Sequence, residues 1–343
     1  MKVYLRELEL PFRHPFTISK GTKTTQPDLL VGLEWKGKWG FGEAPAISYY
    51  HTTTAGMAET LSQKKAQVES FAMTSPERFW HFLHHLFPND PFLVCALDIA
   101  GWDLHGKLLN KSLHQIWGLD PSKIPMTDYT IGIDTPDRMV EKMIEKPWPI
   151  YKVKVGTEGD IERIVALRKH TDAVIRVDAN AGWTLDEAQV KIPMLKDLGI
   201  ELIEQPLAKD DWEGMKILYR TSPLPLYADE SCVSESDVER CAGHFHGINI
   251  KLTKCSGLTP AKRMINHARN LGLKIMLGCM NESTIGTAAM VQLSPLVDHL
   301  DADGPLLLSV DLGTGLHYQE GKISMPEGNG LGVQLNSGLF DLN

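Results

Sequence analysis

Short runs of β-branched and aliphatic residues recur from about residue 125, each followed by a stretch with the apolar spacing of an amphipathic helix. Apolar runs of this length between helices are typical of parallel strands buried on both faces. Eight such units are what an α/β fold of the closed (β/α)8 TIM-barrel type requires. The strands are predicted at Met126–Ile133, Ile150–Val155, Ala173–Asp178, Ile200–Glu204, Leu224–Asp229, Ile248–Lys251, Lys274–Gly278 and Val297–Asp303.

The first third of the chain has a different order of elements. Strand-like runs at Val3–Leu10 and Leu29–Trp35 come first, and helical patterns follow. Strands followed by helices are typical of an α+β unit with its own core. We therefore predict an α+β capping domain over residues 1–124 and a barrel catalytic domain over 125–317, with the tail, 318–343, packing back on the cap.

Composition and charge narrow the classes of function. The 343 residues are 43% hydrophobic and 23% charged, with a formal net charge of −8. These values are ordinary for a globular protein and give no reason to expect nucleic acid or an anionic membrane as partner. No run approaches the roughly 18 apolar residues of a membrane span, and the N-terminus becomes charged too early for a secretory signal. The five cysteines form no Cys-x-x-Cys pair, so we expect a cytoplasmic protein without a zinc site or disulfides, and leave a homo-oligomer open.

Acidic residues stand at the ends of three neighbouring predicted strands, namely Asp178, Glu204 and Asp229. A single acid there is usually a turn former or a helix cap, but the C-terminal strand ends of a barrel form its active-site face. Three carboxylates desolvated together repel one another unless a cation lies between them. Ligands that are all oxygen favour Mg²⁺, and we predict one ion per subunit.

Two lysines are predicted to face each other across the barrel mouth. Lys154 ends the second strand and Lys251 the sixth, which lie on opposite sides of an eight-stranded barrel. A metal-bound carboxylate between them would lose its α-proton to one lysine and regain a proton from the other, giving inversion through an enediolate. Lys152 shares a strand face with Lys154 and is expected to support it electrostatically. Lys254 lies beyond its strand and is expected to be a solvated loop residue.

Short motifs follow one another along nearly the whole chain. They are Gly40–Pro45, Ala96–Lys107, the Lys-x-Lys of 152–154, Asp178–Asn180, Glu204–Pro206, Asp229–Ser231 and Asn249–Lys251. In this order and spacing the set resembles the enolase superfamily, and within it the muconate-lactonising-enzyme subgroup and its dipeptide epimerases of the L-Ala-D/L-Glu type. The resemblance implies a Mg²⁺-dependent isomerase that inverts the α-carbon of the C-terminal residue of a dipeptide, and it suggests recycling of cell-wall peptides.

The resemblance also implies how a dipeptide would be held. Asp301 and Asp303, at the end of the eighth strand, resemble the Asp-x-Asp pair that binds the α-ammonium of the dipeptide, although Asp-x-Asp-Gly is also good turn chemistry. Met280 lies in a segment similar to the Met-x-Glu-Ser of these epimerases. Thr130 and Lys152 are further predicted substrate-binding residues.

A capping-domain loop over residues 16–23 is expected, from the same resemblance, to reach over the substrate. Lys20 is the predicted contact to an acidic substrate side chain, with Lys23 as the alternative. The arginine that Ala-Glu epimerases often carry in this loop is absent here. The preferred dipeptide therefore stays open.

Other functions also stay open on the sequence alone. A muconate cycloisomerase or an o-succinylbenzoate synthase would use the same metal and lysines, but their substrates carry no ammonium group for Asp301 and Asp303 to bind. A Schiff-base barrel aldolase would use one lysine and no metal. A non-catalytic barrel would bind a ligand without exchanging its α-proton.

Overall fold

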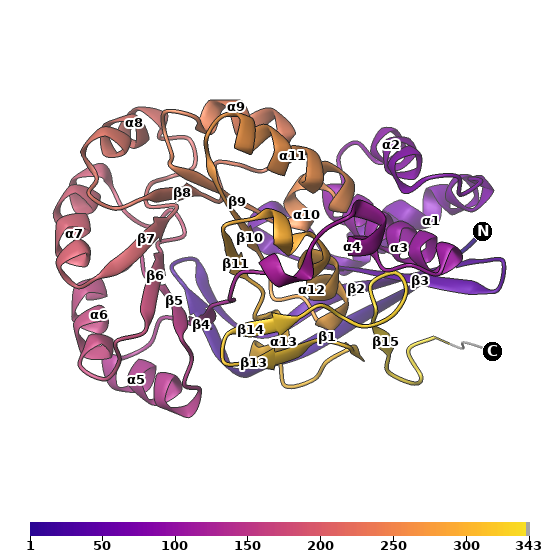
Figure 1. Ribbon diagram of the computed structural model, residues 1–343. Coiled ribbons are helices and arrows are strands. Elements are labelled where there is room, and N and C mark those ends of the chain that lie inside the picture. The colour runs from indigo at the N-terminus through magenta and orange to yellow at the C-terminus, as the bar shows by residue number, and fades with distance from the viewer. Residues whose placement is uncertain (341–343) are drawn as a thin grey trace.

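A parallel barrel makes up the larger part of the molecule in this computed structural model, which describes residues 1–340 (Figure 1). Eight strands neighbour one another in chain order, and a backbone bridge between Thr127 and Leu300 brings the first and last together. The predicted barrel is therefore confirmed. Its strands are β4 (Tyr129–Ile131), β5 (Ile150–Lys154), β6 (Val174–Asp178), β7 (Ile200–Glu204), β8 (Leu226–Ala228), β9 (Gly247–Ile250), β10 (Lys274–Gly278) and β11 (His299–Asp301).

Helices surround the barrel strands and bury their apolar faces on them (Figure 1). Local signals start several of them: Thr184, for example, caps its helix in a reciprocal bond with Glu187. The helices are α5 (Pro136–Glu145), α6 (Asp160–Arg168), α7 (Leu185–Asp197), α8 (Trp212–Thr221), α9 (Val238–Cys241), α10 (Leu252–Cys255), α11 (Leu258–Asn270), α12 (Thr284–Leu293) and α13 (Gly304–Leu307). Among the described residues, no helix is both long and apolar enough to cross a membrane.

The cap consists of an antiparallel sheet and the helices packed on it. Its strands are β1 (Lys2–Ile18), β2 (Gly21–Trp35) and β3 (Lys38–Pro45), and its helices are α1 (Thr54–Ser70), α2 (Pro76–Leu86), α3 (Pro91–Leu109) and α4 (Leu113–Trp117). Strand β3 lies so close to α3 that a Cβ atom on Gly42 would stand 2.0 Å from the Ala96 carbonyl oxygen. Only glycine permits this approach, which fixes the position of β3.

The first hairpin is longer than the sequence pattern predicts. Strands were expected at Val3–Leu10 and Leu29–Trp35, but β1 and β2 continue pairing to Ile18 and Gly21. The additional residues of β1 and β2 show little alternation of apolar and polar positions, so the sequence pattern did not predict them as strand. Contacts with the barrel hold it in place, including a hydrogen bond from the Ile133 backbone N–H to the Thr17 carbonyl (2.8 Å). The predicted loop over residues 16–23 is thus the tip of this hairpin.

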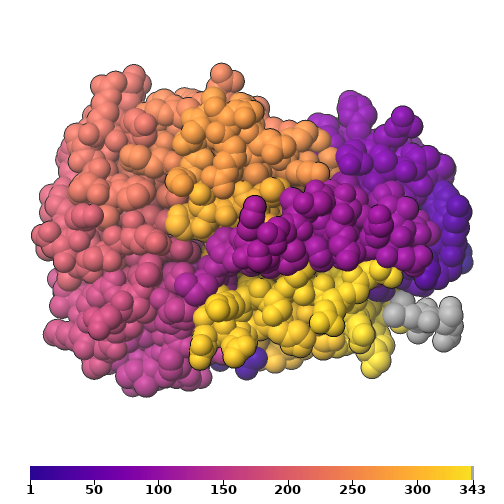
Figure 2. Space-filling model, viewed as in Figure 1, coloured from indigo at the N-terminus to yellow at the C-terminus, as the bar shows by residue number. Residues whose placement is uncertain are grey.

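The C-terminal segment returns to the cap. It forms the short pairs β12 (Gly313–Thr314) with β15 (Gln334–Leu335) and β13 (His317–Gln319) with β14 (Lys322–Ser324). The Phe340 ring stacks on Phe41 with centroids 6.1 Å apart, and the Leu331 backbone N–H donates to Asp103 at 2.8 Å. Figure 2 shows this segment, in yellow, against the purple helices of the first third. Residues 341–343 of the predicted tail lie outside the described residues, and the exact domain limits stay a prediction.

Candidate active site

The three predicted metal-binding acids come together at one end of the barrel. Asp178 and Glu204 end β6 and β7 and are paired in register, and Asp229 directly follows β8. One oxygen of each carboxylate lies within 4.8 Å of the others. The three residues are 0%, 1% and 2% exposed, respectively. This buried set of hard oxygen donors fits Mg²⁺.

Lysine ammonium groups offset the repulsion within this acidic cluster. Lys154 Nζ lies 2.6 Å from Asp178 Oδ2, and Lys251 Nζ lies 2.7 Å from Asp229 Oδ2. Lys152, 1% exposed, lies 2.8 Å from Glu204 Oε2. The two lysines predicted to be the acid/base pair are therefore in direct contact with the predicted metal ligands.

The pKa values of the acids differ because each acid is buried beside different charged groups. Burial alone would raise the pKa of Asp178, but Lys154 and Lys152 outweigh it and lower that pKa to about 2. Burial, reinforced by the charge of Asp178, raises the pKa of Glu204 to about 7. Burial would likewise lower the pKa of Lys251, yet Asp229 and its neighbours raise it well above the ordinary value. Without a further cation, Lys251 is thus held as an ammonium group.

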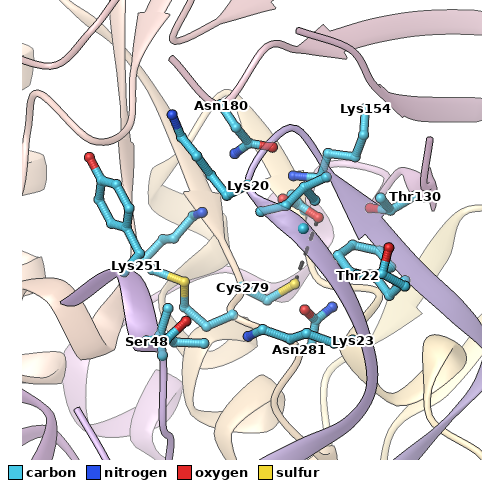
Figure 3. Close-up of a pocket in the computed structure, with 17 residues that line it drawn as sticks. Lys20, Thr22, Lys23, Ser48, Thr130, Lys154, Asn180, Lys251, Cys279 and Asn281 are labelled. Atoms are coloured by element: carbon cyan, nitrogen blue, oxygen red, sulfur yellow. Dashed lines mark hydrogen bonds between the residues drawn. The ribbon is translucent and has the colours of Figure 1, made fainter. Parts of the chain in front are cut away.

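Lys154 and Lys251 lie on opposite sides of a pocket between barrel and cap. They belong to β5 and to the end of β9, four strands apart in the ring. Figure 3 shows the two amines directed into the same cavity, whose volume is about 210 Å³. The residues that line it are Phe16, Ile18, Lys20, Gly21, Thr22, Lys23, Ile47, Ser48, Tyr49, Thr130, Lys154, Asn180, Lys251, Cys279, Met280, Asn281 and Asp301.

The prediction for Lys254 was wrong. This lysine is not a solvated loop residue but lies in α10, 2% exposed. Its Nζ donates to Asp229 Oδ1 at 2.5 Å and to the Asp229 carbonyl at 2.6 Å. The short helix after β9 turns the side chain inward, where Asp229 compensates the cost of burying its charge.

Of the two predicted ammonium-binding acids, Asp301 lines the pocket, whereas Asp303 is fully buried behind the lining residues Thr130 and Cys279. Asp301 ends β11, whereas Asp303 stands beyond the strand, where its Oδ2 accepts a hydrogen bond from the Thr130 backbone N–H at 2.5 Å. Burial, reinforced by the charge of Asp301, raises the pKa of Asp303 to about 7. The Cys279 thiol lies 3.6 Å from Asp303 Oδ1. Lys152 Nζ, 2.7 Å from Asp301 Oδ2, links this acidic pair to the metal-binding acids.

The hairpin tip and the loop after β10 form the remaining walls. Lys20 and Lys23 both line the pocket, as does Met280. Lys20 is exposed and Lys23 is partly buried. The Lys23 ammonium donates to the Gln26 side-chain oxygen at 3.3 Å, and burial lowers the pKa of Lys23.

Two buried polar residues form hydrogen bonds with the predicted metal-binding acids, and neither of them was assigned a role from the sequence. Gln205 follows Glu204 with a left-handed backbone (φ 35°), and its Oε1 accepts from the Asp229 backbone N–H at 3.0 Å. Asn249 Nδ2 donates to Glu204 Oε1 at 2.8 Å. Both residues are fully buried. A polar residue inside an otherwise apolar strand, as Asn249 is, was the available signal.

Comparison with known families places the chain. Residues 1–118 match the family model "Mandelate racemase / muconate lactonizing enzyme, N-terminal domain", and residues 137–339 match "Enolase C-terminal domain-like". The chain therefore belongs to the mandelate racemase / muconate lactonizing enzyme family of the enolase superfamily, and the predicted resemblance is confirmed.

Individual relatives are epimerases. The chain is 48% identical to an L-Ala-D/L-amino acid epimerase of Flavobacterium johnsoniae, over 98% of this chain and 100% of the relative. It is 40% identical to the L-Ala-D/L-Glu epimerase of Bacteroides thetaiotaomicron, over 97% and 88%. The predicted class, an isomerase of the epimerase type, is confirmed by these relatives.

Solved structures of epimerases have the same fold. A dipeptide epimerase of Cytophaga hutchinsonii, complexed with Mg and D-Ala-L-Val, superimposes with a TM-score of 0.94 at 26% identity, over 98% of this chain and 96% of that one. The substrate-liganded L-Ala-D/L-Glu epimerase of Bacillus subtilis gives 0.91 at 29% identity, over 97% and 99%.

Proposed function

We propose that this chain is a Mg²⁺-dependent dipeptide epimerase that inverts the α-carbon of the C-terminal residue. The observation that carries the proposal is the placement of Lys154 and Lys251 on opposite sides of one pocket, each beside the acidic cluster. Amines on both faces of a bound carbon centre permit removal of a proton from one face and delivery to the other. The named relatives and solved neighbours support the same reaction class.

Separate residues of the site would bind the metal and transfer the proton. Asp178, Glu204 and Asp229 would hold Mg²⁺, which when bound neutralises charge growing on the substrate carboxylate and opposes the field that keeps Lys251 protonated. Lys154 and Lys251 would exchange roles as base and acid, according to which enantiomer is bound. Cap residues such as Phe16, Ile18 and Tyr49 line the pocket and would limit the access of water, which would strengthen each of these interactions.

Two acidic groups at the pocket would recognise the two ends of a dipeptide. Asp301, which lines the pocket, and Asp303, buried beside it, would offer negative charge to the substrate ammonium, and the acidic cluster would receive the substrate carboxylate through its metal. The hairpin tip with Lys20 and Lys23 would meet the side chain of the residue that is inverted. This arrangement favours a dipeptide over the substrates of cycloisomerases, which lack an ammonium group.

Solvent-deuterium exchange tests the proposal. With Mg²⁺ in D₂O, a library of L,L-dipeptides with acidic, basic, neutral and apolar C-terminal residues should gain one deuterium at the C-terminal α-carbon of the preferred members. Mass spectrometry detects the added mass, and chiral chromatography detects the L,D product. Wash-in without any inversion would contradict a two-base epimerase, and no wash-in for any dipeptide would contradict the proposed function.

The role of Asp303 gives a separate prediction. Asp303→Asn should raise KM for dipeptides about tenfold or more, because a charge-assisted contact to the substrate ammonium is lost. The affinity for Mg²⁺ should change little, since Asp303 is not one of the three acids that make up the proposed metal site. Steady-state kinetics and calorimetric titration with Mg²⁺ measure the two effects. Equal losses in both would show that Asp303 belongs to the metal site instead.

A further inference from the structure

Glu43, on β3 of the cap, caps a helix that belongs to the barrel. Its carboxylate is fully buried and accepts hydrogen bonds from the Ser283 backbone N–H (2.6 Å), the Ser283 hydroxyl (2.5 Å) and the Gly286 backbone N–H (2.8 Å). Ser283 is the residue before α12, so these donors belong to the start of that helix. The first turn of α12 contains no acidic residue of its own. Glu43 therefore supplies an anion that a helix N-terminus favours, beside Asp311, whose Oδ1 accepts from the Thr284 backbone N–H at 2.9 Å.

The structure around Glu43 is built to admit the carboxylate. A Cβ atom on Gly286 would stand 3.4 Å from Glu43 Oε2 and 2.8 Å from the Glu282 side chain. Glycine at this position leaves room for both acids beside the helix. On the other side, the contact of Gly42 with α3 fixes the strand that carries Glu43.

A second buried acid, Asp28 on β2, faces Glu43. Asp28 is fully buried, and neither of its oxygens has a hydrogen-bond donor within the described part of the chain. Burial, followed by the charge of Glu43, raises the pKa of Asp28 well above its ordinary value. Burial also raises the pKa of Glu43, although Asp28 and the Ser283 and Gly286 donors oppose this rise. The two buried carboxyls interact, and burial disfavours ionisation of both of them.

The segment between β10 and α12 connects Glu43 to the substrate pocket. Cys279, Met280 and Asn281 in this segment line the pocket, and Ser283 is the point that Glu43 holds. The segment is short and internally tied, because Glu282 Oε2 accepts from the Met280 backbone N–H at 2.7 Å. A displacement of Ser283 would therefore move the pocket wall.

We propose that Glu43 is a positioning residue, whose carboxylate fixes the start of α12 and thereby holds the 279–283 segment in the form that receives substrate. The inference rests on the proposed function, since the pocket is taken as the dipeptide site. Lys154 lies on β5 and Lys251 directly after β9, and within the described part of the chain neither lysine forms a hydrogen bond or ion pair with Glu43. Loss of Glu43 should therefore weaken substrate binding and leave the proton-transfer step nearly intact.

The test compares three conservative substitutions. Glu43→Gln places an amide against two N–H donors, and we expect KM to rise about tenfold or more with kcat within about threefold. Amide hydrogen exchange of residues 279–286, measured without substrate, should accelerate. Asp28→Asn should leave KM and exchange nearly unchanged, because it removes the neighbouring acid but none of the Ser283 and Gly286 donors to Glu43. The control is Glu187→Gln, which alters a comparable carboxylate at the exposed start of α7 and should change neither measurement.

The outcomes separate this inference from the proposed function. If the wild type turns over no dipeptide, and Glu43→Gln nevertheless shows faster amide exchange, the proposed function is wrong and the structural role of Glu43 stands. A folded Glu43→Gln protein with unchanged KM, or with kcat reduced as much as kcat/KM, would overturn the inference. If Glu43→Gln does not fold, Glu43→Asp decides, since it keeps the charge, withdraws the carboxylate from Ser283 and Gly286 by one methylene group and should raise KM in the same direction.

Discussion

Replacing Lys154 or Lys251 by methionine should slow inversion by about 10²–10⁴-fold or more, the usual contribution of a general acid or base. Methionine keeps the length of the side chain but cannot carry a proton. Each substitution leaves the neighbouring acid with a cation, because Lys152 lies 3.3 Å from Asp178 and Lys254 lies 2.5 Å from Asp229. We therefore expect both variants to fold and the loss to be chemical.

Isotope exchange distinguishes this loss from a general defect. A variant with one lysine should still exchange the α-proton of the enantiomer that faces the remaining amine, while inversion of either enantiomer is lost. Chiral chromatography and mass spectrometry of both substrate enantiomers measure this, and the control is Lys196→Met, at an exposed position of α7. If either variant retains full inversion, the two-base mechanism is wrong.

Removal of Mg²⁺ should abolish activity, and Glu204→Gln should weaken Mg²⁺ binding by about 100-fold or more, because one of three charged ligands becomes neutral. Glu204 also lies 2.8 Å from Lys152, so the variant alters the balance of charge around that ammonium group. Mg²⁺ at about 100 times its Kd should stabilise the wild type by about 2.7 kcal/mol. Thermal melting with and without Mg²⁺ should show this gain in the wild type and not in Glu204→Gln.

The matched control for the metal site is Glu201→Gln. Glu201 lies on the same strand, β7, but its carboxylate pairs with Arg176 Nε at 2.6 Å and is partly exposed. Its substitution should leave the Mg²⁺-dependent shift in melting temperature intact. The metal assignment fails if EDTA leaves turnover unchanged, or if Glu201→Gln loses the shift and Glu204→Gln keeps it.

The barrel and its reactive residues could be predicted from the sequence because parallel strands leave a strong local signal. Apolar runs at regular intervals mark the strands, and an acid or lysine at the end of such a run is conspicuous. Since all strands of a parallel barrel end on one face, Asp178, Glu204 and Asp229 could be expected to meet there. The same rule of order around the ring placed Lys154 and Lys251 on opposite sides.

Only the tertiary structure decided what lies beyond the strand ends. Lys254 is three residues from Lys251, and its burial depends on the direction of a four-residue helix that no sequence pattern marked. The extension of β1 and β2 depends on contacts with the barrel, and the capping of α12 joins Glu43 to Ser283 across 240 positions. A sequence pattern reports regular local structure, whereas these contacts depend on how separate elements pack against one another.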